Sequence, residues 1–165
     1  LDMAHRGARH VRGIEVREKN LAMARFLQDY YQLKNVDFEQ GDVDAMSRHQ
    51  PVDVVLCLGL LYHVVHPIDL VEFCFANSRR FAVIDTICHK EPISAYHVVG
   101  NKDTSVSIEG TRAIELHPTY RALIDTMKAA GFKEIIEVDG ECEAQIELYS
   151  DLTRRCLIGF KDPMT

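Results

Sequence analysis

Two acidic residues stand where predicted strands end. Glu15 lies near the end of VRGIEV, residues 11–16, and Asp42 follows a glycine near the end of NVDFEQGDV, residues 35–43. A carboxylate has two oxygens that accept hydrogen bonds, so Glu15 can bind a vicinal diol such as that of a ribose. Asp42 can accept a hydrogen bond from an amino group such as that of adenine. Acids are also common at helix N-termini and in turns. A purely structural role for Glu15 and Asp42 therefore stays open beside the binding role.

Strands and helices alternate along the chain and must position these acids. Residues 17–33 predict a helix, because apolar positions recur in them at helical spacing without glycine or proline. The segment PVDVVLCLG, residues 51–59, is a nearly continuous apolar strand, which is typical of strands buried on both faces. The remaining predicted elements are a helix over 66–78 that Pro67 begins, a strand over 79–88, a helix over 117–132 that Pro118 begins and Gly131 ends, and strands over 133–140 and 153–161.

This order predicts a single α/β domain over residues 1–165. Its expected architecture is a Rossmann-like, mostly parallel open sheet with helices on both faces and an antiparallel final strand. Ligands of such sheets bind beyond the carboxyl ends of the strands. We therefore expect Glu15, Asp42 and the Leu58–Gly59 pair to line one rim.

Three segments together resemble class I S-adenosylmethionine-dependent methyltransferases. They are GIEVREKNLAMAR at 13–25, NVDFEQGDV at 35–43 and VDVVLCLGLLYHVVHP at 52–67. The resemblance continues in the helix and strand over 117–138 and in the final strand, TRRCLIGFK. Within the class, LGLLYHVVHP is most similar to the branch that includes the tRNA wobble-uridine carboxymethyltransferase.

The resemblance implies S-adenosylmethionine as the cofactor and methyl transfer to a small molecule or an RNA base as the function. It also implies six cofactor-binding residues. These are Glu15 and Val16 at the ribose, Asp42 and Val43 at the adenine, and Leu58 and Gly59 at the end of the fourth strand of the family's sheet.

His63 is the candidate catalytic base, because histidine titrates near neutral pH. A packing or helix-start role is its alternative. Tyr62, Tyr96 and Arg112 are candidate substrate contacts, the last two because long loops such as residues 90–115 are often functional. The alternative for residues 90–115 is a solvent-exposed loop that contains an extra hairpin.

No metal site is expected from the sequence. His63 and His66 share helical spacing, but a metal ion needs further ligands at a compatible geometry. His89 and His97 are available as ligands, and nothing in the sequence fixes them nearby.

The sequence departs from the family in one respect: it has no D-x-G-x-G loop, whose glycines let the backbone approach the cofactor. The residues before Val11 resemble the helix that follows this loop. The sequence therefore predicts an N-terminally truncated domain without the first strand. A non-catalytic methyltransferase-like binding domain or inactive fragment is the alternative function, and a nicotinamide-binding domain is a weaker one.

Composition limits the other functions. The net charge of −6 argues against strong nonspecific nucleic-acid binding. No apolar run reaches the roughly 18–20 residues of a membrane span. The five scattered cysteines indicate free, mostly buried thiols in a reducing cytoplasm. The sequence does not indicate an oligomeric state.

Overall fold

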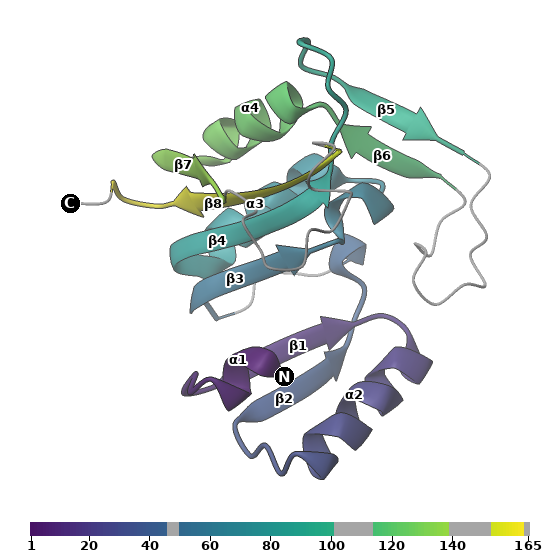
Figure 1. The fold of residues 1–165 in the computed structure, drawn as a ribbon, viewed down its shortest axis with the longest axis vertical. Coiled ribbons are helices and arrows are strands. Elements are labelled where there is room, and N and C mark those ends of the chain that lie inside the picture. Colours follow the sequence, from purple (N-terminus) through teal and green to yellow (C-terminus); the bar gives the residue numbers. More distant parts are fainter. Residues whose placement is uncertain (46–49, 101–113, 139–152, 164–165) are drawn as a thin grey trace. The chain divides into compact units, whose positions relative to one another are not determined.

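The computed structural model describes residues 1–45, 50–100, 114–138 and 153–163 (Figure 1). The chain divides into two compact units, Leu1–Ser47 and Arg48–Thr165. A single domain over the whole chain stays a prediction.

The first unit is a parallel strand pair with helices. Its elements are α1 (Asp2–His5), β1 (Val11–Glu15), α2 (Glu18–Tyr30), β2 (Val36–Gln40) and the 3₁₀ turn η1 (Val43–Ala45). The register sets Glu15 opposite Gln40, so both strands end at the same edge. Leu21 of α2 and Val36 of β2 are buried and form part of the core of this unit.

The second unit holds a four-stranded sheet in the order β3-β4-β8-β7 and a separate β5–β6 pair. β3 and β4 are parallel, whereas β8 lies antiparallel between β4 and β7. The α/β class, the parallel pairs and the antiparallel final strand are confirmed. The elements are β3 (Val52–Leu58), η2 (Leu61–His63), α3 (Pro67–Asn77), β4 (Ser78–Ile87), β5 (Tyr96–Val99), β6 (Glu115–Pro118), α4 (Tyr120–Ala130), β7 (Glu134–Glu137) and β8 (Arg154–Phe160).

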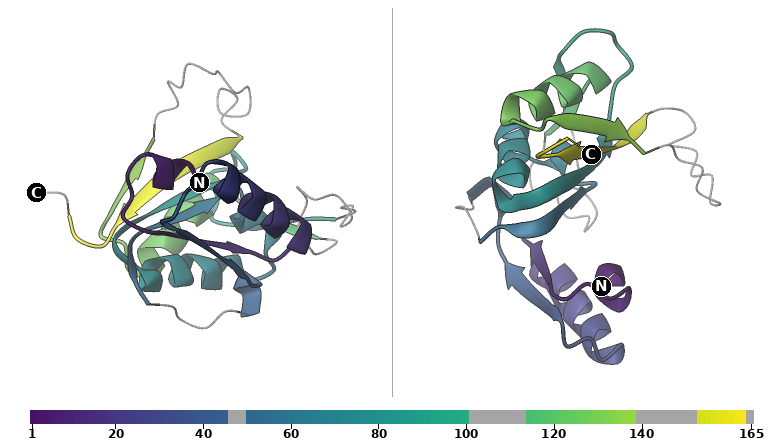
Figure 2. Two further views of the ribbon diagram at one scale, coloured as in Figure 1. Left: turned by 90° about the horizontal axis from the view of Figure 1, so that it is seen from below. Right: turned by 90° about the vertical axis from the view of Figure 1, so that its left-hand side faces the viewer.

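Helices α3 and α4 lie side by side on one face of the four-stranded sheet (Figure 2). Leu123 and Met127 of α4 are fully buried, and the Phe75 and Phe132 rings meet edge to face at 5.1 Å. Burial also raises the pKa of the Cys88 thiol to about 12, which leaves it unreactive at neutral pH. Among the described helices, none has the length and apolar character that crossing a membrane requires.

The predicted burial of β3 on both faces is wrong. Within this strand only Cys57 is buried, and the side chains of Leu56 and Leu58 are 43% and 58% exposed. Leu56 and Leu58 alternate with Cys57 along the strand, so they lie on the face opposite Cys57, whose thiol contacts Cys74 of α3. β3 is also the edge strand of the four-stranded sheet and pairs with β4 alone. An apolar run predicts a strand but not its position in the sheet.

Pro118 does not begin the predicted helix over 117–132. It is the last residue of β6, and Thr119 caps α4 by accepting a hydrogen bond from the Ala122 amide at 3.1 Å. A threonine before the first turn is a preferred cap, which the proline beside it obscured. The predicted end of the helix is confirmed at Gly131, whose φ is +116°.

Replacing Gly131 by alanine should lower the free energy of unfolding by at least about 1–2 kcal/mol, since the left-handed backbone penalises any Cβ. The added Cβ would also lie 2.8 Å from the Phe75 ring. Urea denaturation of Gly131→Ala measures the change. Gly100→Ala is the matched control, because its Cβ would meet nothing within 4 Å. Equal stability of the two variants would contradict the strain argument.

Candidate functional site

Glu15 ends β1 with its carboxylate turned toward the start of α2. One carboxylate oxygen accepts a hydrogen bond from the Arg17 amide at 2.9 Å, and the other accepts from the Asn20 side chain at 3.4 Å. Glu15 therefore does form hydrogen bonds at the start of a helix, which is the alternative role that the sequence left open. Since a carboxylate offers about four acceptor positions, these two contacts do not exhaust it.

Asp42 lies beside the same edge of the β1–β2 pair. The amide of Gly41 donates to the Glu15 carbonyl at 3.2 Å, which ties the end of β2 to the end of β1. The Asp42 carbonyl then accepts from Ala45 at 3.0 Å and opens the turn that starts at Val43. The structure thus brings the two predicted acids to one edge. Val16 beside them is 36% exposed.

Gly59 follows β3 in a conformation that favours glycine, with φ at +67°. Its amide donates to the Asp85 carbonyl at 2.9 Å, and a Cβ built on it would lie 2.8 Å from the Arg154 guanidinium. The position therefore excludes a side chain for two independent reasons. Leu58 before it is exposed and lies opposite Asp85 in the parallel register.

Asp85 and Arg154 form a buried ion pair between β4 and β8. Arg154 donates through Nε to Asp85 Oδ1 at 2.8 Å and also contacts it through Nη2. The two side chains are only 6% and 18% exposed. The sequence analysis missed this pair, although a single acid within the apolar run FAVIDTIC was a usable signal.

A second buried carboxylate, Glu115 at the start of β6, lies between two histidines. His117 Nε2 is hydrogen-bonded to Glu115 Oε2 at 2.7 Å, and His63 Nδ1 lies 2.8 Å from Glu115 Oε1. The Glu115 side chain is 1% exposed. The Tyr62 ring packs against both histidines, with centroid distances of 4.1 Å and 5.6 Å.

This cluster gives His63 the surroundings of a general base. The carboxylate lies within ion-pair distance of Nδ1 but without hydrogen-bond geometry, and a carboxylate at this distance favours a protonated imidazole. Nε2 is then the ring nitrogen for proton transfer. Glu115 was not among the predicted residues. The pattern IELHP, an acid and a histidine within a short apolar strand, was its only signal.

The structure also brings together His89, Glu91 and His97, which the sequence did not place near one another. One potential ligand atom from each lies within 4.8 Å of the other two. The His89 and His97 rings stack at 4.2 Å, and His97 Nε2 lies 3.1 Å from a Glu91 oxygen. Burial and the neighbouring His97 lower the pKa of His89, which favours its neutral form.

The remaining predicted substrate residues differ in their surroundings. The Tyr96 hydroxyl is hydrogen-bonded to Thr126 of α4 at 3.0 Å, which gives it a packing role. Burial raises the pKa of Tyr96. Arg112 lies outside the described residues. The antiparallel β5–β6 pair confirms the hairpin alternative for the stretch around 90–115.

Comparison with curated proteins finds ubiquinone biosynthesis O-methyltransferases. The protein from Neisseria meningitidis serogroup C (strain 053442) is 30% identical over 101 residues, which cover 59% of this chain and 42% of that protein. The one from Acinetobacter baumannii (strain AYE) is 34% identical over 74 residues, covering 44% and 31%. This chain thus spans less than half of the relatives it matches. No protein-family model matches the chain.

Solved structures show that the fold is that of S-adenosylmethionine-dependent methyltransferases. The N-terminal domain of EvdMO1 with SAH bound matches 96% of this chain and 67% of its own with a TM-score of 0.79 and 22% identity. The S-adenosylmethionine-dependent methyltransferase described as putative from Listeria monocytogenes matches 99% and 84%, with a TM-score of 0.65 and 15% identity.

The Asp85–Arg154 pair should be strongly coupled. Arg154→Met removes the arginine that contacts the buried Asp85 carboxylate and should cost about 3–5 kcal/mol of unfolding free energy, whereas Asp85→Asn combined with Arg154→Met should cost less than the sum of the single changes. Urea denaturation of the four proteins of this cycle measures the coupling.

The exposed Asp53–Arg79 pair, 3.5 Å apart, is the control. Its coupling should stay below about 1 kcal/mol. Additive effects at Asp85 and Arg154 would show that their contact does not stabilise the fold.

Proposed function

We propose that this chain is the cofactor-binding and catalytic part of an S-adenosylmethionine-dependent methyltransferase that methylates a hydroxyl group of a small molecule. The observation that carries the proposal is the pair of acids, Glu15 and Asp42, at one strand edge of this fold. An SAH-bound domain with the same fold supports the cofactor. The names of the O-methyltransferase relatives support an oxygen acceptor.

The residues present fit such a cofactor. Glu15 keeps acceptor positions for a ribose diol beyond its two hydrogen bonds within the chain. Asp42 supplies an acceptor for an adenine amino group, with Val43 as an apolar neighbour. Val16 is an exposed apolar side chain directly beside the end of β1 in the first unit. In the second unit the exposed Leu58 ends β3, and Gly59 follows it in a backbone conformation that favours glycine. Each of these roles is proposed from the residue's own surroundings.

When bound, S-adenosylmethionine supplies a methyl group activated by its sulfonium sulfur. With that group bound, His63 Nε2 would accept the proton of the substrate hydroxyl. Glu115 stabilises the imidazolium that forms on His63. Tyr62 lies against His63 and is the proposed substrate contact, with Tyr96 and Arg112 as further candidates.

A small molecule is favoured over RNA as the acceptor. A net charge of −6 opposes the phosphate backbone, whose neutralisation dominates RNA affinity. An RNA base, as the resemblance to the wobble-uridine branch implies, is the second candidate.

Calorimetric titration of the 165-residue chain with S-adenosylhomocysteine tests the cofactor site. We expect saturable binding that Glu15→Ala weakens by about 1–3 kcal/mol, the scale of hydrogen bonds to a charged group. Asp37→Ala is the matched control, since Asp37 is an exposed acid on the neighbouring strand. Absence of binding to the folded chain would favour a non-catalytic domain, and equal losses in both variants would remove Glu15 from the site.

His63→Ala should lower kcat by about 10²–10⁴-fold, the usual contribution of a general base, without changing the affinity for S-adenosylhomocysteine. The assay follows S-adenosylhomocysteine formation with a panel of phenols, catechols and sugar alcohols as acceptors. Glu115→Gln should lower kcat less and shift the pH profile. Cofactor binding without turnover of any acceptor would overturn the small-hydroxyl substrate class, and full activity of His63→Ala would overturn the base.

A further inference from the structure

The cluster of His89, Glu91 and His97 has the donor set of a transition-metal site. Two imidazoles and one carboxylate are the protein ligands of one class of catalytic zinc site and of several non-haem iron sites. One nitrogen or oxygen of each residue lies within 4.8 Å of the others. In a tetrahedral site with metal–ligand bonds of about 2.0–2.1 Å, ligand atoms lie about 3.3 Å apart, so binding requires the three side chains to rotate inward and the stacked His89 and His97 rings to separate.

The second observation concerns the Nε2 atom of His89. This nitrogen is buried, and among the described residues it has no hydrogen-bond partner. A buried polar atom without a partner costs free energy, and a bound cation would satisfy it. The neighbouring ring of His97 turns its Nε2 toward Glu91 at 3.1 Å, which is an ion-pair contact that a metal ion can replace.

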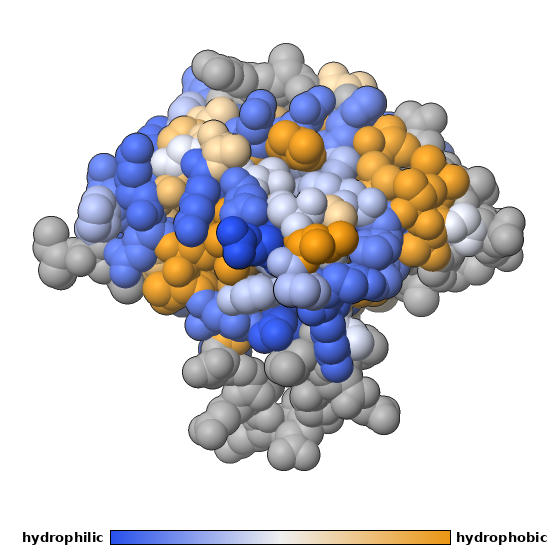
Figure 3. All heavy atoms as spheres, turned by 90° about the horizontal axis from the view of Figure 1, so that it is seen from above, coloured by the Kyte–Doolittle hydropathy of each residue, from blue (hydrophilic) through white to orange (hydrophobic). Residues whose placement is uncertain are grey.

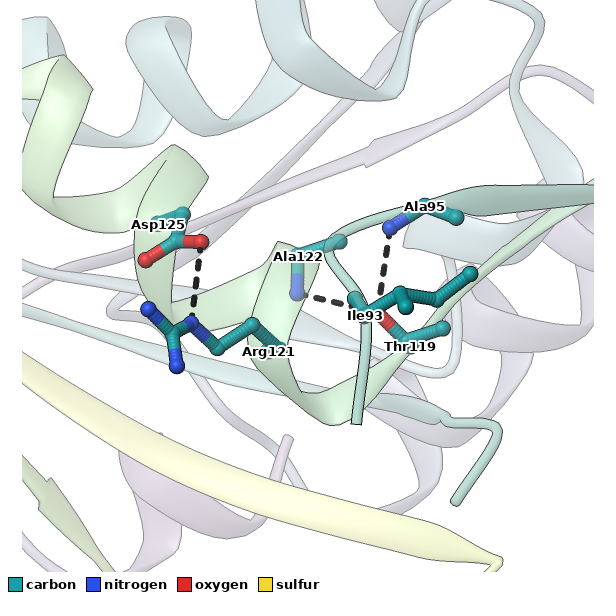
Figure 4. Close-up of polar contacts among 6 residues, drawn as sticks. All are labelled: Ile93, Ala95, Thr119, Arg121, Ala122 and Asp125. Atoms are coloured by element: carbon teal, nitrogen blue, oxygen red, sulfur yellow. Dashed lines mark hydrogen bonds and ion pairs between the residues drawn. The ribbon is translucent and has the colours of Figure 1, made fainter. Parts of the chain in front are cut away.

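The backbone that carries the three residues is held by Thr119 (Figure 4). Its hydroxyl donates to the Ile93 carbonyl at 2.6 Å and accepts from the Ala95 amide at 3.2 Å, while its amide donates to the Ala95 carbonyl at 2.8 Å. His89 is fixed from the same place, because its amide donates to the Pro118 carbonyl at 2.9 Å. The backbone at His89, Ile93 and Ala95 is therefore hydrogen-bonded to Pro118 and Thr119.

The site is open on one side. The Glu91 and His97 side chains are 47% and 35% exposed. The exposed apolar residues Ile93 and Val98 lie next to the ligand-bearing positions in the sequence. Figure 3 shows one face of the molecule, on which hydrophilic and hydrophobic residues are interspersed. An ion can reach the cluster from solvent.

We propose that His89, Glu91 and His97 bind one divalent first-row transition-metal ion, with zinc as the reference ion. Three protein ligands leave a coordination position for water or an oxygen ligand, as in catalytic zinc sites. The ring of His117, which is hydrogen-bonded to Glu115, lies 5.7 Å from His89, so the ion would adjoin the His63 cluster. This site does not depend on methyl transfer.

Calorimetric titration of the metal-free chain with Zn²⁺ tests the proposal. We expect one equivalent to bind and both Glu91→Gln and His97→Gln to weaken it at least about tenfold, since each removes one of three ligands. His10→Gln is the matched control, because His10 also forms a His–carboxylate pair, with Asp37 at 3.3 Å, but has no third ligand within the described ranges of the chain. Circular dichroism checks that every variant is folded.

Substoichiometric binding, or binding equal in the wild type and both variants, would overturn the site and leave only a surface ion pair. Cobalt substitution provides a second readout. Nitrogen and oxygen ligands give weak visible bands alone, whereas a strong sulfur-to-cobalt charge-transfer band would assign the ion to cysteines and contradict the proposal.

Discussion

The arrangement of the second unit depends on the contacts of the buried Glu115 carboxylate with two histidines. A buried acid is stable only when it is paired, and Glu115 meets this requirement through His63 and His117. These contacts join η2, which follows the exposed edge strand, to β6. Because β6 also pairs with β5 and leads directly into α4, the position of one carboxylate links the candidate base, the hairpin and the helix behind it.

Local sequence patterns predicted most of the fold. Helical spacing gave α2, the apolar runs gave β3 and β4, and Pro67 and Gly131 marked a helix start and a helix end as expected. The position of a strand within a sheet has no such local signal. An apolar run is compatible with a central or an edge strand, so the exposure of Leu56 and Leu58 was not predictable.

The positions of the candidate residues were predictable only for residues that are close in sequence or stand at strand ends. Glu15 and Asp42 lie at one edge, as expected, because parallel strands bring their ends together. Their role in cofactor binding stays a prediction. Asp85 pairs with a residue on a distant strand, and the histidines at 89 and 97 meet because β5 and β6 form a ladder. Pairings of this kind depend on the register between strands, which a single sequence does not reveal.

The space that Gly59 leaves is filled by the Arg154 guanidinium, which is the partner of Asp85. A side chain at position 59 would press on the arginine and disturb its contact with the aspartate. Residues 59, 85 and 154 lie far apart in the sequence, so a substitution after β3 is felt by an ion pair that joins β4 to β8. The glycine therefore contributes to the charge pairing of the sheet although it has no side chain of its own.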